Sequence, residues 1–260
     1  MSLFSDSGRL SDSLIPSPPP SSGSVGSEGE RSEPERATEP DDGGRATPDP
    51  EVVHRPVRRR FTVDYKQRIL TEVDAAADTL RNSDTIILQF EIPLETVYYT
   101  VHFARQHNIR CIVNPAPAAP VRLAELAAAD YFVPNETEAE AISGLPVHSI
   151  DDAKKCAAAL LQKGFRKVIL TLGARGSLLA TAQATEVIAP FQVTPKDTTG
   201  AGDAFIGSFS AFLAEGLPEQ EALSRANLYA AVSTLRVGTQ KSFPKRSEFE
   251  DEWNRRTAKL

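Results

Sequence analysis

The stretch IDDAKKCAAALLQKGFRKVILTL, residues 150–172, joins a helical pattern to a short apolar run. Its first part, Ile150–Lys163, carries apolar residues at the three- and four-residue spacing of an amphipathic helix. The run Lys167–Leu172 that follows is short and rich in β-branched and aliphatic residues, which is typical of a buried strand. A helix that leads directly into a buried strand predicts one unit of a parallel sheet covered by helices.

The same alternation extends to both sides of this unit. Further strands are predicted at Thr85–Phe90, Arg110–Val113 and Tyr131–Val133, with a hairpin around Ser177–Ala189. Helices are predicted between and after them, at Asp64–Arg81, Leu94–Gln106, Ala119–Ala128, Thr137–Ile142, Gly200–Glu215 and Pro218–Leu235. The predicted fold class is therefore α/β, with a mostly parallel sheet between layers of helices.

The segment from Met1 to about Pro56 has a different composition, dominated by Ser, Pro, Gly, Glu and Asp, and it holds almost half of the chain's 19 prolines. Such a segment buries too little apolar surface to offset the entropy of ordering it. We therefore predict a disordered tail over residues 1–60 and a globular domain over residues 61–260.

Composition and charge exclude several classes of function. A formal net charge of −6 argues against general nucleic-acid binding. The two cysteines, Cys111 and Cys156, lie in a strand pattern and a helix pattern, so buried thiols are predicted rather than a disulfide or a metal pair. No apolar run reaches the roughly 18–20 residues that span a bilayer, and the early Asp6 and Asp12 argue against a mitochondrial leader. We predict a cytoplasmic protein, with nuclear import through Arg58–Arg60 as an alternative.

The strongest chemical signal is the stretch Asp197-Thr198-Thr199-Gly200-Ala201-Gly202-Asp203-Ala204-Phe205. Its small residues at positions 200–202 let an anion approach the backbone N–H groups without obstruction. The start of the following helix adds unpaired donors and the positive end of the helix dipole, which predicts an anion hole for a phosphate. Asp203 lies beside this hole, where a carboxylate can accept the proton of a substrate hydroxyl during phosphoryl transfer. The alternative is that Asp203 only caps the helix.

This stretch closely resembles the signature of the ribokinase-type (pfkB) family of carbohydrate kinases. Three further segments occur in the order and spacing of that family: NPAPA at 114–118, PNETEAE at 134–140 and TLGARG at 171–176. The resemblance covers about Phe61 to the C-terminus. Within the family it is closest to the ribokinases, because QFEIPLE at 89–95 is similar to their sugar-contacting segment.

The resemblance implies a three-layer α/β/α sandwich and an ATP-dependent kinase that phosphorylates the 5-hydroxyl of D-ribose. Fructose or a nucleoside is the alternative acceptor, which Glu91 and the 114–118 segment disfavour. The implied ligands are ATP, Mg²⁺, a pentose, and K⁺ or another monovalent cation.

The resemblance also implies a role for each matching residue. Asp203 is the implied catalytic base, and both Asp203 and Glu91 are implied to bind the sugar. The anion hole is formed by Gly200, Ala201 and Gly202. The implied ATP-binding residues are Asn135, Thr171, Leu172, Gly173, Ala174, Arg175, Gly176, Gly202, Asp203 and Asn227. Mg²⁺ is implied near Glu138, through water, and K⁺ at Asp197, Thr199, Ser233, Arg236, Gly238 and Ser242.

Most of these residues also have a purely structural explanation. Glu91 would be a charged strand end that faces water, and Asn227 an exposed polar position. Asn135 and Glu138 would form a helix N-cap and its capping box. The glycines of 171–176 would make an ordinary turn, and Gly238 would follow a helix end.

The sequence departs from the family on its N-terminal side. Family members begin with a strand that carries a sugar-binding Asn or Asp, followed by a Gly-Gly-x-x-x-Asn segment and a small β-sheet lid. None of these is found, and Gly43-Gly44 is followed by Arg45 in a polar run. We therefore expect a domain truncated on its N-terminal side, with weak ATP binding and poor ribose phosphorylation. A non-catalytic nucleotide-binding or regulatory protein, and an incomplete product without a stable fold, are the alternatives. Homodimers occur in the family. Their interface is often built by the lid, which is not found in this sequence.

Overall fold

The computed structural model describes residues 61–258, and the predicted disordered tail over residues 1–60 lies outside them. The described residues form one six-stranded sheet in the order β1-β2-β3-β4-β5-β6. Its strands are β1 (Thr85–Gln89), β2 (Arg110–Asn114), β3 (Tyr131–Phe132), β4 (Lys167–Thr171), β5 (Ser177–Thr181) and β6 (Thr185–Ile188). The first four pair in parallel, and β5 and β6 pair antiparallel, which confirms the predicted mostly parallel sheet and its hairpin.

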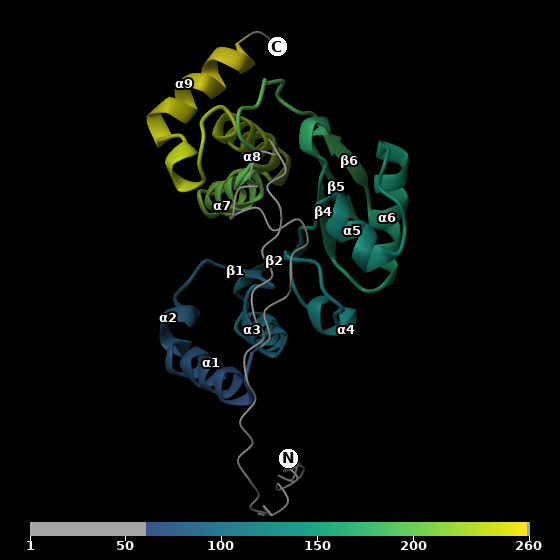
Figure 1. Ribbon diagram of the computed structural model, residues 1–260, viewed down its shortest axis with the longest axis vertical. Coiled ribbons are helices and arrows are strands. Elements are labelled where there is room, and N and C mark those ends of the chain that lie inside the picture. The colour runs from purple at the N-terminus through teal and green to yellow at the C-terminus, as the bar shows by residue number, and fades with distance from the viewer. Residues whose placement is uncertain (1–60, 259–260) are drawn as a thin grey trace, which may run out of the picture. The chain divides into compact units, whose positions relative to one another are not determined.

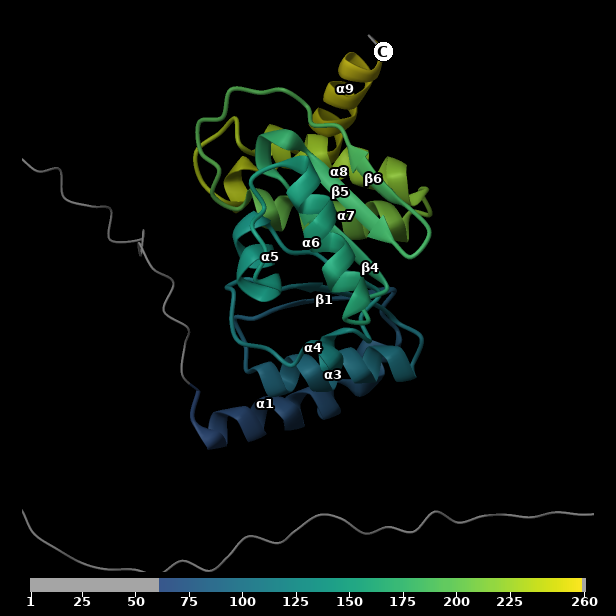
Figure 2. The ribbon, with the colours of Figure 1, turned by 90° about the vertical axis from the view of Figure 1, so that its right-hand side faces the viewer.

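Helices cover both faces of this sheet and make the three layers of an α/β/α sandwich (Figures 1 and 2). One face carries α3 (Leu94–Gln106), α4 (Leu123–Leu126), α5 (Glu136–Ser143) and α6 (Ile150–Gln162). The helices α1 (Val63–Ala75) and α2 (Ala77–Arg81) lie beyond α3 on the same side. The other face carries α7 (Ala201–Ala214), α8 (Glu219–Ser233) and α9 (Arg246–Thr257).

The central strands are apolar on both faces because both faces are covered. In β4, Val168 and Leu170 belong to the hydrophobic cluster beneath α3–α6, whereas Ile169 between them belongs to the cluster beneath α7–α9. All three side chains are fully buried. Side chains along a strand alternate between faces, so an unbroken apolar run is what a strand covered on both sides requires.

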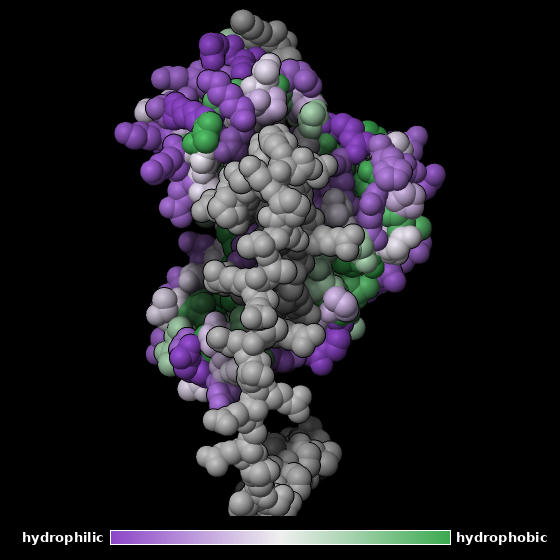
Figure 3. Space-filling view, in the orientation of Figure 1, coloured by the Kyte–Doolittle hydropathy of each residue, from purple (hydrophilic) through white to green (hydrophobic). Residues whose placement is uncertain are grey.

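Three local predictions were inaccurate. The helix predicted at Asp64–Arg81 is divided at Ala76 into α1 and α2. The helix predicted at Ala119–Ala128 is only the four-residue α4, and Pro120 accounts only for the loss of Ala119, because proline disfavours helical backbone at the residue before it. The helix α9 was not predicted. Its sequence is mostly charged, and its surface is hydrophilic (Figure 3), yet Phe249 on it is fully buried.

Strand β1 is covered less completely than its neighbours. Ile87 of β1 and Ile112 of β2 are paired in register, but Ile87 is 41% exposed whereas Ile112 is fully buried. Ile112 belongs to the cluster beneath α7–α9, so that layer ends before it reaches β1. Both cysteines are free and buried, as predicted. Among residues 61–258, no helix is long and apolar enough to cross a membrane.

Candidate active site

The candidate site lies where the parallel strands end. Gln89 and Asn114 are the last residues of β1 and β2 and are paired in register, so both side chains reach the same edge of the sheet. Asp203 approaches this edge from the first turn of α7, which belongs to the opposite layer. The carboxyl edge of a parallel sheet is where open α/β folds place their ligands.

A chain of hydrogen bonds connects the side chains at this edge. The amide of Gln89 donates from Nε2 to Oδ1 of Asp203 over 2.9 Å and to Oδ1 of Asn114 over 3.0 Å. Asn114 in turn donates from Nδ2 to Oε2 of Glu138 over 3.3 Å and to the carbonyl of Val133 over 2.8 Å. The carboxylates of Asp203 and Glu138 are therefore joined through two amides.

Gln89 and Asn114 lie in segments that carry the family resemblance, but neither was predicted as a site residue. A usable signal existed, because each is a polar residue that ends an apolar strand. Sequence alone does not show which strands are neighbours, so the pairing of these two residues appears only in the fold.

The backbone amides of the predicted anion hole, residues 200–202, differ in their hydrogen bonding. Gly200 adopts a left-handed conformation, with φ of 77°, as the N-cap of α7. The amide of Ala201 donates to the carbonyl of Thr198 over 3.2 Å, so it is not free for an anion. The amides of Gly202 and Asp203 have no acceptor among residues 61–258, as expected for the first turn of a helix. In this turn, the amides of Gly202 and Asp203 are therefore unpaired, whereas that of Ala201 is not.

Asp203 is exposed and does not cap α7. The N-cap is Gly200, and no side-chain hydrogen bond caps this helix. The hydrogen bond from Gln89 instead holds the carboxylate toward the sheet. The explanation of Asp203 as a simple helix cap is therefore wrong, and its carboxylate is placed beside the two free amides.

Asn135 and Glu138 form the predicted capping box of α5. Glu138 accepts hydrogen bonds from the backbone and the side chain of Asn135, both over 2.9 Å, and from Asn114. Its carboxylate is almost completely buried, and burial raises its pKa above the ordinary value of glutamate, although these hydrogen bonds act in the opposite direction. Three of the roughly four acceptor positions of this carboxylate are therefore occupied by hydrogen bonds within the protein.

The segment Thr171–Gly176 leaves β4 through one turn of 3₁₀ helix. Thr171 forms an isolated parallel bridge with Asn135, which brings this loop beside the capping box. Gly176 has φ of 86°, and a Cβ there would lie 2.2 Å from the carbonyl oxygen of Ile188, so only glycine fits.

Arg175 anchors this loop. Its guanidinium forms an ion pair with Glu136 and donates to the carbonyl of His148 over 2.7 Å and to that of Val147 over 3.3 Å. The guanidinium of Arg175 is therefore engaged by one carboxylate and two backbone carbonyls.

Asn227 is buried rather than exposed, which corrects its structural explanation. Only 9% of the residue is exposed. Its amide donates to the carbonyls of Ile188 and Ala189 over 3.3 and 3.2 Å, and so ties α8 to the end of β6. It therefore shapes the wall that follows β6.

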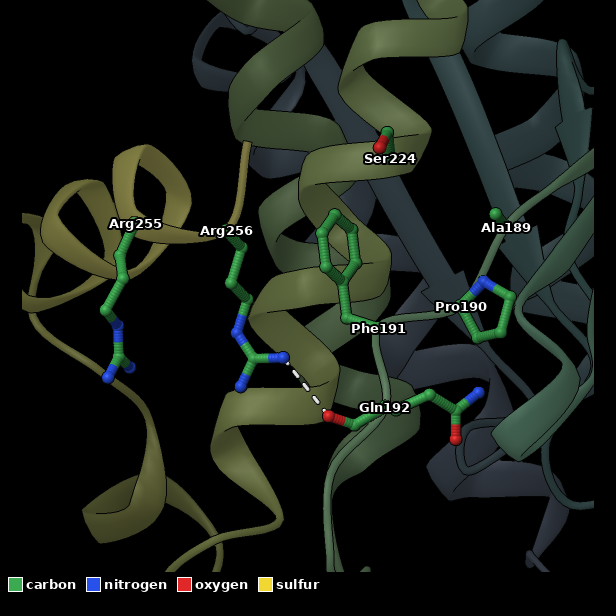
Figure 4. Close-up of a pocket in the computed structure, with 7 residues that line it drawn as sticks. All are labelled: Ala189, Pro190, Phe191, Gln192, Ser224, Arg255 and Arg256. Carbon is green, nitrogen blue, oxygen red and sulfur yellow. Dashed lines mark hydrogen bonds between the residues drawn. The ribbon is translucent and has the colours of Figure 1, made fainter. Parts of the chain in front are cut away.

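A cavity of about 520 Å³ lies along this same wall (Figure 4) and does not include Asp203. It is lined by Ala189–Gln192 after β6, by Ser224 of α8, one turn before Asn227, and by Arg255 and Arg256 of α9. Arg256 donates to the carbonyl of Gln192 over 3.1 Å and closes one side (Figure 4). The cavity is thus built from the two segments that Asn227 joins and from α9.

Glu91 lies exposed in the turn after β1. Its carboxylate has no hydrogen bond or ion pair within the described part of the chain, so it is available to a ligand. The next residue toward the strand, Phe90, donates its amide to the carbonyl of Ala116 over 2.8 Å. This bond brings the turn beside the 114–118 segment.

The two loops of the predicted cation site lie side by side. Asp197 accepts hydrogen bonds from the amides of Gly238 and Thr199, over 2.8 and 2.9 Å, which lower its pKa. Ser233 and Ser242 are buried, with hydroxyls bonded to carbonyls of their own turns. Arg236 is directed to Glu248.

Backbone carbonyls are the available ligands at these loops. Those of Asp197, Thr199, Arg236 and Gly238 accept no hydrogen bond from residues 61–258. The described residues include no group of three His, Cys, Asp or Glu side chains placed to hold a metal ion. Neutral carbonyl oxygens are therefore the ligands that these loops could offer a cation.

A family model and individual proteins are similar to this chain. The model of the pfkB family carbohydrate kinases matches residues 65–246. A deoxyribokinase of Salmonella typhi is 38% identical over 181 residues, which are 69% of this chain and 59% of that protein.

Solved ribokinase structures have the same fold. The ribokinase of Thermotoga maritima matches with a TM-score of 0.62 and 37% identity, over 68% of this chain and 59% of its own. The Arabidopsis thaliana ribokinase complexed with ribose and ATP matches with a TM-score of 0.66 and 25% identity, over 68% and 58%. The chain thus spans about three-fifths of the length of these relatives.

Proposed function

The chain belongs to the pfkB family of carbohydrate kinases, and from that membership we propose that it carries the phosphate-transfer side of an ATP-dependent pentose kinase. One observation carries the proposal. The carboxylate of Asp203 lies beside the two unpaired amides of α7 and is held there by Gln89 from the facing strand. A base and an anion hole in this arrangement are what phosphoryl transfer to an alcohol needs.

In the proposed reaction, Asp203 accepts the proton of a sugar hydroxyl. The hydroxyl oxygen forms a bond to the γ-phosphorus of ATP as the bond between that phosphorus and the leaving oxygen of ADP breaks. The amides of Gly202 and Asp203 stabilise the negative charge on the phosphoryl oxygens. Mg²⁺ bound with ATP would neutralise part of the triphosphate charge, with Glu138 orienting its water ligands.

D-ribose is the proposed acceptor, at its 5-hydroxyl. Glu91 supports a polyhydroxylated acceptor, because its free carboxylate can accept hydrogen bonds from neighbouring sugar hydroxyls. The similar Arabidopsis protein is a ribokinase whose structure holds ribose and ATP. The likeness to a deoxyribokinase favours 2-deoxyribose as a second candidate.

Positioning of the sugar is the weakest part of the proposed site. Among the described residues, only Glu91 and Asp203 are assigned to sugar binding. Correct orientation of both reactants can lower a reaction barrier by roughly 7–11 kcal/mol, and much of this would be lost. We therefore expect measurable ATP binding, with pentose turnover by the 260-residue chain far below the ordinary kinase range of about 1–100 s⁻¹.

The test measures ATP binding and sugar-dependent ADP release separately, with Mg²⁺ and K⁺ present. Ribose and 2-deoxyribose are compared as acceptors, in wild type and in Asp203→Asn. The asparagine variant should bind ATP as wild type does and should lose about 10²–10⁴-fold of any turnover. Asp251→Asn is the matched control, because Asp251 is an exposed carboxylate of α9 outside the site.

Each outcome has a distinct meaning. ATP binding without turnover of either sugar would identify a non-catalytic nucleotide-binding protein. Asp203→Asn with wild-type turnover would remove Asp203 from the mechanism. A higher kcat/KM for 2-deoxyribose than for ribose would replace the proposed acceptor by the second candidate.

A further inference from the structure

A second concave surface lies at the opposite edge of the sheet from Asp203, where β2, β3 and β4 begin. Its cavity of about 490 Å³ is open to solvent and is lined mainly by polar and charged side chains. The lining includes Arg105 from the last turn of α3, Arg110 at the start of β2, and Arg166 and Lys167 at the start of β4. Four cations from three elements thus meet at one hollow.

The acidic groups of this hollow are already neutralised. Asp130 accepts the backbone amide of Cys111 over 2.9 Å and forms an ion pair with Arg166 over 3.0 Å. Glu219 of α8 accepts the hydroxyl of Tyr131 and forms an ion pair with Lys167. Each carboxylate therefore has a basic partner and does not oppose an incoming anion.

Two of the four cations remain without a carboxylate. Within the described part of the chain, Arg110 donates a hydrogen bond only to the hydroxyl of Thr85, over 3.5 Å, and neither Arg105 nor Arg110 forms an ion pair. Four cations against two carboxylates leave a net charge of about +2 at the hollow. The protein as a whole has a formal net charge of −6. An anion that binds at this hollow would therefore be attracted by the local positive charge and not by the overall charge of the protein.

We propose that this hollow binds the phosphate group of a small phosphorylated molecule, at a site separate from the phosphate-transfer site. Arginine matches the geometry of phosphate because its planar guanidinium offers several N–H donors at once. Arg105 and Arg110 would supply these donors, while the buried side of Tyr131 forms the floor of the hollow. The volume exceeds that of one phosphate and falls in the range of sites for small metabolites, about 300–1,000 Å³.

The experiment uses the full 260-residue chain and isothermal titration calorimetry without Mg²⁺, at roughly physiological salt, about 0.15 M. The probes are inorganic pyrophosphate, a pentose phosphate and ADP. They present phosphate groups alone, on a sugar and on a nucleoside, respectively. All titrations are made in a Gly202→Asp background. A Cβ at Gly202 meets open space, so this variant places a carboxylate in the anion hole without a clash and removes the competing site.

In this background, the double variant Arg105→Ala, Arg110→Ala should weaken binding of the preferred probe by about tenfold or more. Lys163→Ala, an exposed cation at the end of α6, is the matched control and should bind as its parent does. If the double variant melts at a lower temperature, the single variant Arg105→Glu replaces it, because Arg105 is exposed.

Two results would overturn the proposal. One is unchanged affinity after the arginine substitutions, and the other is no binding of any of the three probes in the Gly202→Asp background. The preferred probe identifies the carrier. Because Gly202→Asp removes the phosphate-transfer site, failure here leaves the proposed kinase function untouched.

Discussion

The side-chain amide of Gln89 donates a 2.9 Å hydrogen bond to the carboxylate of Asp203, although the two residues are 114 positions apart. The bond joins the end of β1 to the first turn of α7 and so connects the two layers that meet at the site. A carboxylate held by one neutral donor keeps a lone pair for a substrate proton. Gln89 is therefore a positioning residue in the proposed reaction.

The first prediction follows from this contact. Gln89→Met keeps the length of the side chain and removes the donor, so Asp203 should lose its orientation. We expect a fall in kcat of about tenfold, near the value of one hydrogen bond to a charged group, with ATP affinity unchanged. Gln89→Glu should have a larger effect because it places a second carboxylate beside Asp203. A change confined to KM for ATP would contradict a role through Asp203.

The second prediction concerns Glu138 and pH. Burial raises the pKa of Glu138, so the folded protein holds this proton more tightly than the unfolded chain. The stabilisation is fully present below the unfolded pKa of about 4.3 and is lost as pH rises through the folded pKa.

Denaturant unfolding from about pH 4 to pH 8 measures this effect. The free energy of unfolding of wild type relative to Glu138→Gln should fall as pH rises through this range. Glu72→Gln, at an exposed carboxylate of α1, is the matched control. A difference that is constant with pH would mean that the pKa of Glu138 is the same in both states.

The third prediction concerns the cation loops. If the free carbonyls around Asp197 and Gly238 hold a monovalent cation, K⁺ should raise ATP affinity more than Na⁺ at matched ionic strength, because carbonyl ligands discriminate by size and field strength. Titration with the two chloride salts checks this. Asp197→Asn weakens the hydrogen bond that joins the loops, over 2.8 Å, and should reduce the preference for K⁺. An equal ATP affinity of wild type in both salts would mean that the loop at 233–242 holds no selective cation site and only ends a helix.

The fourth prediction uses the register pair Ile87 and Ile112. Ile112→Ala should lower the free energy of unfolding by about 2–5 kcal/mol, because it opens a cavity in the core. Ile87→Ala should lower it by less than about 1 kcal/mol, because Ile87 is 41% exposed. The same denaturant titration measures both variants. Equal losses would show that Ile87 is covered in solution.

Ile87→Lys tests the exposed edge itself. β1 is an uncharged edge strand, and such edges invite pairing with other chains, which a lysine blocks. Light scattering at increasing protein concentration should show less association for the lysine variant than for wild type. Ile87→Val, which keeps the edge apolar, should associate as wild type does.

Several features could be predicted from sequence because they are local. The strands at 85–89, 110–114, 131–132 and 167–171 coincide with apolar runs, and the motif at 197–205 forms the start of α7 as its glycines require. The capping box of Asn135 and Glu138 could also be predicted, since its two residues are only three positions apart. The mostly charged α9 was missed, because a helix anchored through Phe249 and few other apolar residues shows little periodicity.

The sequence by itself determined the α/β class, the order of elements and the glycine turn that begins α7, because each depends on periodicity or on short-range backbone conformation. Only the tertiary structure decided that Gln89 and Asn114 connect Asp203 to Glu138, that Asn227 is buried, and that Arg105 and Arg110 share a hollow. These contacts join residues from different strands and helices. They depend on which strands become neighbours and which faces are covered, and those choices are set by packing of the whole core rather than by any local pattern.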